Sequence, residues 1–309
     1  MNRPVSLFPA ALLIGLLLVS GCASQKLPQD EVLREESRGK VSRENPELPQ
    51  VSRTGPQDTA KPVFAPYSQE LRIPLWEDPP AGMKPDEVPA LTISVDLLDP
   101  AIPLGTAGNP EILGQRFRDI FYRGLSPQDY TQEQARIHAM EYRDMGDEVR
   151  SNPRMIFSAS LNWTYEEELT TEFSSARLLV ISRERHSYTG GAHGNYDKSY
   201  FVFDRELGIQ IGLSDIIRGD AGPVLTALIN RELRAGQNLG AADSLKQRGF
   251  FVDDVELTEN YFLSSGGLGF HWDPYEIAPY VTGYVEILIP YAGIRELLGP
   301  EGQHLIREF

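Results

Sequence analysis

The chain has 309 residues, a net charge of −15 at pH 7 and a single cysteine. One cysteine excludes an intramolecular disulfide and a zinc site built from several thiolates, so the hydrophobic core must stabilise the fold. After residue 90 there are 19 Lys and Arg against 32 Asp and Glu, a net charge of −13. This charge repels nucleic acid, and we expect no nucleic-acid partner.

The start of the chain has the pattern of a bacterial lipoprotein signal. The apolar run from Ala10 to Val19 is too short to span a bilayer permanently, and two small residues then lead to Cys22. We therefore expect residues 1–21 to be a signal peptide and Cys22 to be the acylated N-terminus of a cell-envelope protein. In a Gram-negative cell the expected location is the outer membrane, facing the periplasm. The lipid anchor is then the only contact with the membrane.

Residues 22–88 are expected to form a proline-rich tether between the anchor and the domain. Prolines recur through this stretch, including the pair Pro79-Pro80, and apolar clusters are few. Prolines at this density interrupt helices and central strands, which favours a disordered segment. Four residues near its end could still pack on the domain: Phe64, Tyr67, Leu75 and Trp76.

Residues 89–309 are predicted to form the domain. Leu91–Leu98 alternates as a half-buried strand does. Two helices should follow the caps Asn109-Pro110 and Ser126-Pro127, and Asn152-Pro153 should end the second. Strand runs then follow at 157–165, 176–187, 200–203, 261–264, 268–272 and 284–289. A helix is expected between the third and fourth of these runs, and a closing helix at 292–298 is expected after the last. Hairpin-linked strands with inserted helices predict an α+β fold with a mostly antiparallel sheet. Two subdomains, 89–189 and 190–309, are an alternative to a single unit.

The first motif is a glycine turn, Gly190-Gly191-Ala192-His193-Gly194, between two strand runs. These glycines indicate a backbone with positive φ, or one that packs too closely for a Cβ atom. A phosphate cradle would need a helix directly after the glycines, whereas an aromatic strand follows here. His193 could act as a general base or metal ligand, or its ring could simply fix the turn.

The second motif runs from Asp273 to Tyr280 and contains two Pro-Tyr pairs, Pro274-Tyr275 and Pro279-Tyr280. Prolines restrict the backbone, and tyrosines offer a large contact area with a polar tip, so the segment is suited to recognition. In the alternative interpretation the tyrosines complete the core.

Together the two motifs resemble the RsiV-like extracellular domain family, found in the lysozyme-sensing anti-sigma factor RsiV and before the catalytic module of the peptidoglycan deacetylase PdaC. The resemblance covers roughly Leu91 to Leu298. It implies a domain that binds lysozyme, with Pro274, Tyr275, Pro279 and Tyr280 in the contact. The chain shows neither the transmembrane helix of the anti-sigma factor nor a deacetylase module, so we expect the binding module alone.

We therefore expect a cell-envelope lipoprotein that binds a lysozyme-type muramidase or a cell-wall ligand such as peptidoglycan, with no cofactor. One alternative is an enzyme that acts on peptidoglycan through His193 and nearby carboxylates. Another is a structural envelope lipoprotein. A zinc site formed by His193, His271 and Asp273 is a further alternative to a metal-free domain.

Overall fold

The computed structural model describes residues 63–103, 108–152 and 159–309. The predicted signal peptide, Cys22 and most of the predicted tether lie outside these ranges. All the described residues belong to one compact unit. In the described part of the chain, no helix has the length and apolar character needed to cross a membrane.

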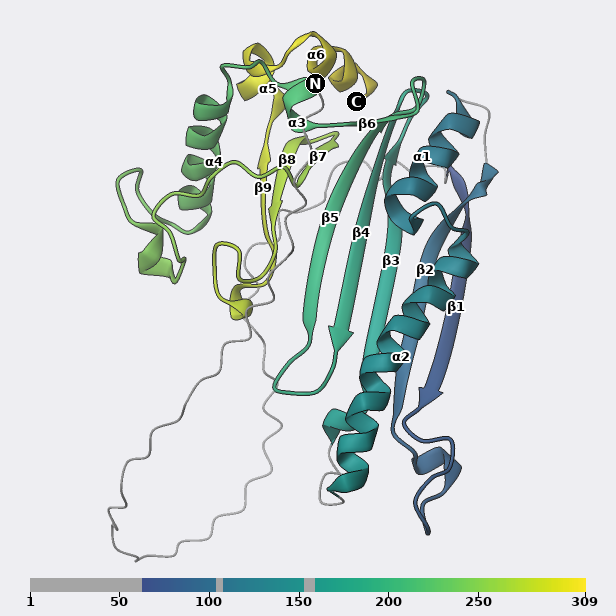
Figure 1. The fold of residues 1–309 in the computed structure, drawn as a ribbon. Helices are drawn as coiled ribbons and strands as arrows, with labels where there is room; N and C mark the ends of the chain where they lie inside the picture. The colour runs from purple at the N-terminus through teal and green to yellow at the C-terminus, as the bar shows by residue number, and fades with distance from the viewer. Residues whose placement is uncertain (1–62, 104–107, 153–158) are drawn as a thin grey trace, which may run out of the picture. The chain divides into compact units, whose positions relative to one another are not determined.

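The fold is α+β, as predicted, and contains a six-stranded and a three-stranded sheet (Figure 1). The larger sheet has the order β1-β2-β3-β4-β5-β6, in which only β2 and β3 are parallel. Its strands are Phe64–Pro74, Ala90–Pro103, Trp163–Ser174, Leu178–Tyr188, Asn195–Asp204 and Ile209–Ile211. The smaller, antiparallel sheet has the order β7-β8-β9, with strands Tyr261–Ser264, Gly267–Trp272 and Val285–Ile289.

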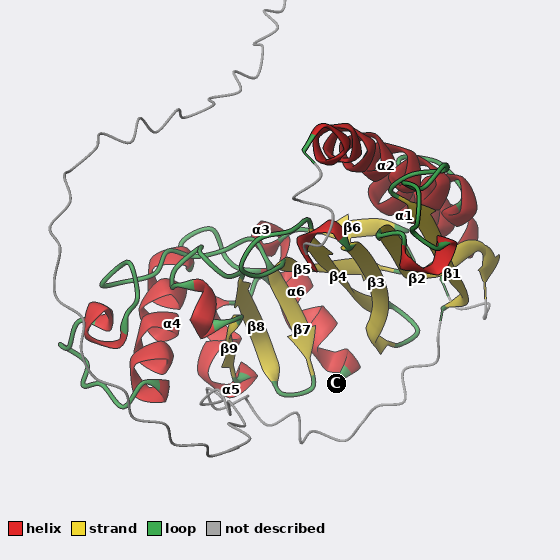
Figure 2. Cartoon of the chain, turned by 90° about the horizontal axis from the view of Figure 1, so that it is seen from below, coloured by secondary structure: helices red, strands yellow, loops and turns green. Residues whose placement is uncertain are grey.

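Two helices connect the parallel strands β2 and β3 and cover one face of the larger sheet. Both begin at the predicted caps: α1, Pro110–Tyr122, at Asn109, and α2, Pro127–Ser151, at Ser126. Each cap side chain accepts a hydrogen bond from a backbone N–H of the first turn, and a proline occupies the first helical position. Figure 2 shows the two helices on the same side of strands β1–β4.

The C-terminal half supplies the smaller sheet and four helices. The predicted helix after β6 is α4, which lies beside β9 (Figure 2). The predicted closing helix 292–298 is instead interrupted, because α5 ends at Ile294 and a 3₁₀ turn follows. The helices are α3, Leu213–Ile216; α4, Gly222–Gly236; α5, Tyr291–Ile294; and α6, Pro300–Leu305.

The larger sheet separates two hydrophobic cores. Along β4, Leu179 and Ile181 pack with α1 and α2, whereas Leu178 and Val180 pack with the C-terminal half. Successive side chains of a strand point to opposite faces, so each face can be buried against a different layer. The predicted subdomain boundary after residue 189 is wrong, because it would divide the β4–β5 hairpin within this sheet.

The predicted end of the tether at residue 88 is also wrong. Residues 64–74 form the edge strand β1, which pairs with β2 along its whole length. Phe64 is fully buried and packs edge-on against Phe117, with ring centroids 4.9 Å apart. Trp76 is buried as well, and its Nε1 donates to the carbonyl of Gly146 on α2. The edge position of β1 explains how its prolines are accommodated, since an edge strand tolerates lost ladder bonds.

One further expectation along β3 needs correction. Residues 157 and 158 of the run predicted at 157–165 lie outside the described ranges, and in the rest of the run the strand begins at Trp163, after a 3₁₀ turn at Ala159–Leu161. The strand contains the acidic stretch Glu166-Glu167-Glu168, whose side chains alternate between the two faces of the sheet. Glu166 and Glu168 are exposed, but Glu167 is buried and accepts hydrogen bonds from the hydroxyls of Tyr130 and Tyr165.

We predict that Phe64→Ala destabilises the protein by about 3–5 kcal/mol, the usual cost of emptying a fully buried phenylalanine site. Chemical denaturation measures the loss, and Pro66→Ala at an exposed position of the same strand is the control. A chain that starts at Leu91 should likewise be far less stable than one that starts at residue 63. Equal stability of these two chains would show that β1 contributes nothing to the fold.

Candidate functional site

The two sequence motifs meet in the structure, although they are about 80 residues apart. The ring of His193 stacks on Tyr280, with centroids 4.0 Å apart and planes inclined by 18°. The Tyr275 hydroxyl lies 3.4 Å from Nε2 of His193. The glycine turn and the loop from Asp273 to Tyr280, termed the Pro-Tyr loop below, therefore form one continuous surface.

The glycine turn connects β4 to β5, as predicted. Gly190 and Gly191 have φ values of 91° and 104°, a region that side-chain-bearing residues avoid. A Cβ atom on Gly194 would lie 2.8 Å from the carbonyl oxygen of Ser187. His193 is exposed, and its Nδ1 hydrogen bonds to the Gly194 carbonyl 2.9 Å away. The ring thus fixes the turn from outside the core.

The Pro-Tyr loop is a compact turn that presents one tyrosine to solvent. Tyr275 N–H donates to the Ala278 carbonyl, and Asp273 N–H donates to the Glu276 carboxylate at 2.6 Å. Tyr275 has a φ of 71°, which is uncommon for a residue with a side chain and often marks a functional site. Its side chain is 54% exposed, whereas Ile277 and Ala278 are buried. The core is therefore completed by these apolar residues and not by Tyr275.

A buried histidine anchors the start of this loop. His271 has no exposed surface, and each of its ring nitrogens lies 3.0 Å from a carboxylate, Asp273 on one side and Glu286 on the other. Burial by itself lowers the pKa of His271, but the two carboxylates outweigh it and raise the pKa above its ordinary value. Burial likewise raises the pKa of Glu286, and hydrogen bonds from His271 and Tyr200 reverse this and lower it.

The anchor extends to the larger sheet through Lys198 on β5. Its backbone N–H donates to Asp273 at 2.9 Å, and its buried Nζ lies 3.6 Å from Glu172 and 3.7 Å from Glu184. The sequence analysis missed this group. The available signal was Lys198 itself, which shares the inward face of β5 with Tyr200 and Val202, because a buried lysine requires carboxylate partners.

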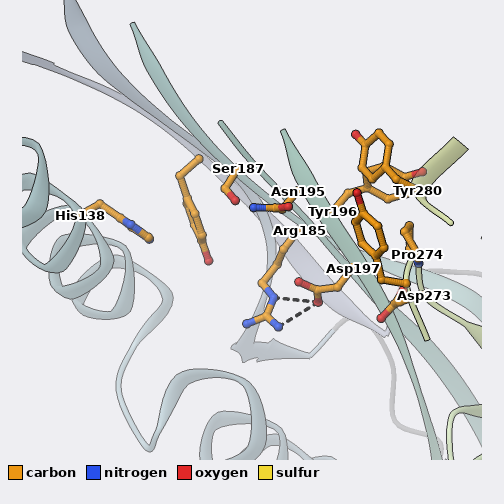
Figure 3. A pocket seen from close by; sticks show the side chains of 11 residues that line it. His138, Arg185, Ser187, Asn195, Tyr196, Asp197, Asp273, Pro274 and Tyr280 are labelled. Atoms are coloured by element: carbon orange, nitrogen blue, oxygen red, sulfur yellow. Dashed lines mark hydrogen bonds and ion pairs between the residues drawn. The ribbon is translucent and has the colours of Figure 1, made fainter. Parts of the chain in front are cut away.

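A pocket of about 460 Å³ opens between α2, strands β3–β5 and the Pro-Tyr loop. Figure 3 shows His138 on one side of it and Tyr280 on the other, with Arg185 and Asp197 between them. Of the predicted residues, Pro274, Tyr275 and Tyr280 line the pocket, and Pro279 does not. The other lining residues are His138, Tyr165, Arg185, Ser187, Asn195, Tyr196, Asp197 and Asp273.

The polar groups of this pocket are largely paired with one another. Nε and Nη2 of Arg185 donate to one oxygen of Asp197 at 3.1 and 2.8 Å. Burial lowers the pKa of Arg185, but its bond to Asp197 outweighs this and raises it. Burial also lowers the pKa of His138, which favours the neutral imidazole. The pocket therefore presents little unbalanced charge to a ligand.

A smaller pocket of about 220 Å³ adjoins the first, since Ser187, Asn195, Tyr196 and Tyr280 line both. Gly194 of the glycine turn is among its lining residues, together with Thr164, Glu166, His186 and Tyr188. Gly190, Gly191 and His193 support the turn without lining either pocket.

The geometry does not support the zinc alternative. His193 contacts two tyrosines and a backbone carbonyl, while both nitrogens of His271 face carboxylates. Within the described residues, no group of three or more His, Cys, Asp and Glu side chains is placed to hold a metal ion.

We predict that the contribution of His271 to stability depends on pH. Its raised pKa means that the stabilisation is complete below the ordinary value of 6.5 and is lost as the pH rises through the folded-state value. The lowered pKa of Glu286 means that its share is present above 4.5 and is lost as the pH falls. The difference in free energy of unfolding between wild type and His271→Asn should therefore be largest between pH 4.5 and 6.5.

Urea denaturation from pH 4.5 to about pH 9 measures this difference. His304→Asn, which changes an exposed histidine, is the matched control. A destabilisation by His271→Asn that stays constant across the whole range would contradict the assignment of a charged His271.

Comparisons with known proteins relate the site to a domain family. Residues 214–292 match the family described as "Protein of unknown function (DUF3298)". A crystal structure of a DUF3298 family member from Bacteroides fragilis is similar, with 25% identity and a TM-score of 0.64, over 80% of this chain and 98% of that one. A DUF3298 family protein from Pseudomonas aeruginosa has 17% identity and a TM-score of 0.49, over 77% and 95%. No curated protein matches the chain.

The matched segment runs from α3 into α5 and includes the smaller sheet and the whole Pro-Tyr loop. The glycine turn, Arg185 and Lys198 lie before it, on the larger sheet. Residues 214–292 are thus similar to the DUF3298 family, and the candidate site lies where this segment meets the strands that precede it.

Proposed function

We propose that the chain is a cell-envelope lipoprotein whose domain binds a basic protein, with a lysozyme-type muramidase as the leading candidate. The observation that carries the proposal is the exposure of Tyr275 on the Pro-Tyr loop. The first residue of this loop, Asp273, is fixed by hydrogen bonds with the His271 ring and the Lys198 backbone N–H. Val281, directly after the loop, is 77% exposed. Exposed tyrosines on a preorganised backbone are typical anchors of protein interfaces, because little conformational entropy is lost on binding.

The charge of the domain supports a basic partner. Asp96, Glu166 and Glu168 are exposed on the face of the larger sheet opposite α1 and α2, with Asp96 and Glu168 in register on neighbouring strands. Together with the net charge of −13 after residue 90, these residues create a field that accelerates the approach of a cationic protein. The resemblance of the paired motifs to the RsiV-like family supports the same class of partner.

The enzyme alternative receives less support from the site. A general base is normally oriented by a third group, and His193 is held instead by a backbone carbonyl and by tyrosines. Its ring is exposed and does not line the pocket.

A bound muramidase would be restrained near the membrane, so the biological outcome we propose is protection of peptidoglycan by an inhibitor or decoy.

We predict that Tyr275→Ala weakens binding to a purified lysozyme at least about tenfold, mainly through faster dissociation, because truncation of an interface anchor costs about 2 kcal/mol or more. Tyr275→Phe, which keeps the ring, should bind nearly as wild type. Glu166→Lys with Glu168→Lys should instead slow association, with an effect that shrinks as salt is added.

Surface plasmon resonance at low and physiological salt separates the two rates. Glu167 is excluded from the charge-reversal set because it is buried. Absence of any lysozyme affinity at low salt would refute the muramidase proposal. Normal binding by Tyr275→Ala would place the interface away from the Pro-Tyr loop.

The lipid anchor is proposed from the sequence pattern that ends at Cys22. We predict that Cys22→Ser leaves the protein unprocessed or soluble, because no thiol remains for acylation. Mass spectrometry of membrane and soluble fractions provides the measurement. Identical mature, membrane-bound protein from both genes would contradict the anchor.

A further inference from the structure

The larger of the two adjoining pockets has a chemistry that differs from that of the exposed acidic surface. In the larger pocket Arg185 is paired with Asp197, and Asp273 is paired with the buried His271. A charged ligand would have to break one of these pairs or be buried without a partner, and either is costly. The larger pocket therefore favours a neutral ligand, and the exposed Glu166 of the smaller pocket adds a carboxylate that can accept a hydrogen bond from a ligand hydroxyl.

The walls of the pockets specify that ligand further. Tyr196, Tyr275 and Tyr280 supply aromatic surface along one side, and Tyr165 on β3 adds to it. Polar groups lie beside these rings, including the amide of Asn195 and the hydroxyl of Ser187, and they can donate and accept hydrogen bonds. A flat ligand with an apolar face and a rim of hydroxyl groups satisfies both features, because the rings stack on the face and the polar groups bind the rim.

The sizes and arrangement of the pockets indicate a chain of such units. The larger pocket, at about 460 Å³, lies in the range of about 300–1,000 Å³ that is usual for small-molecule sites. The smaller one, at about 220 Å³, shares Asn195, Tyr196 and Tyr280 with it. A ligand of linked rings could place one unit in each pocket and cross at these shared residues.

We infer that the two pockets form a binding site for a neutral oligosaccharide, with the tyrosines as stacking surface and with Ser187 and Asn195 as the polar contacts that both pockets share. This inference rests on the pockets alone and does not depend on the muramidase proposal. If the glycan and muramidase proposals are both correct, the domain binds a glycan and a protein at neighbouring surfaces, since Tyr275 is exposed to solvent and also lines the larger pocket.

Isothermal titration calorimetry of the mature chain tests the inference with three probes: chitotetraose, cellotetraose and a cationic tetrapeptide rich in arginine. We expect saturable binding of at least one oligosaccharide and none of the peptide. Asn195→Ala and Tyr275→Ala should each weaken that binding about tenfold or more, whereas Tyr275→Phe should retain it. Phe251→Ala, which changes an exposed aromatic side chain outside both pockets, is the control.

Thermal melts establish that each variant is folded, and Asn195 is exposed at the start of β5, so its truncation should leave the core intact. Lack of binding by both oligosaccharides would overturn the inference, as would saccharide binding that neither Asn195→Ala nor Tyr275→Ala weakens. Preferential binding of the cationic peptide would also overturn it and would identify a peptide site. Lysozyme binding is measured separately on the same proteins, so failure of one proposal is distinguishable from failure of the other.

Discussion

The buried cluster around His271 is the interaction on which the rest of the candidate site depends. His271 and Glu286 are direct cross-strand partners on β8 and β9, so the register of the smaller sheet places them opposite one another. Asp273 approaches the other ring nitrogen from the start of the Pro-Tyr loop. Charged groups are tolerated at such depth only when each has a partner, and removal of one would leave the others buried and uncompensated. The loop is therefore held in place by an arrangement that permits little displacement.

The same cluster also provides a hydrogen-bond partner for the backbone of β5, on the side of the larger sheet that β6 covers only in part. Strand β6 pairs only with the last residues of β5, from Val202 to Asp204. The preceding stretch of β5 pairs with β4 on one side and, among the described residues, has no strand on the other. Side chains replace that strand: Asp273 accepts from Lys198 N–H, while Asn260 accepts from Tyr200 N–H and donates to the Lys198 carbonyl. A buried backbone group left without a partner would be costly, and these side chains avoid the cost. As a consequence the Pro-Tyr loop lies directly against β5 and its glycine turn.

Two kinds of surface result from this arrangement, and they act over different distances. The exposed carboxylates on β2 and β3 act through the long-range field, over roughly the Debye length of 8–10 Å at ordinary salt. The charges in the pocket are paired over about 3 Å and leave little field outside. Approach of a partner and selection of a ligand thus depend largely on different parts of the molecule. Two residues link these parts: Glu166 belongs to the acidic face and lines the smaller pocket, and Tyr275 is exposed and lines the larger one.

Local pattern was sufficient for the elements that local forces define. Asn109-Pro110 and Ser126-Pro127 identified both helix starts, and the glycines of residues 190–194 identified the β4–β5 turn, because caps and positive φ values depend on a few neighbouring residues. Alternation also located β7, β8 and β9 to within a residue or so. Alternation did not identify β1, because its prolines are typical of a disordered segment. This edge strand is stabilised by pairing with β2 and by the burial of Phe64 in the core.

By itself the sequence determined the α+β class, the starts of helices α1 and α2 and both motifs of the candidate site. Only the tertiary structure decided that these motifs touch, that Lys198 and Glu286 hold the loop, and that Arg185, Asn195 and Asp197 complete the pocket. None of these three pocket residues stands out in the sequence, because each is an ordinary polar residue of a strand. Their role arises from contacts between segments about 80 residues apart, and such contacts depend on strand register and on the packing of two sheets rather than on local preference.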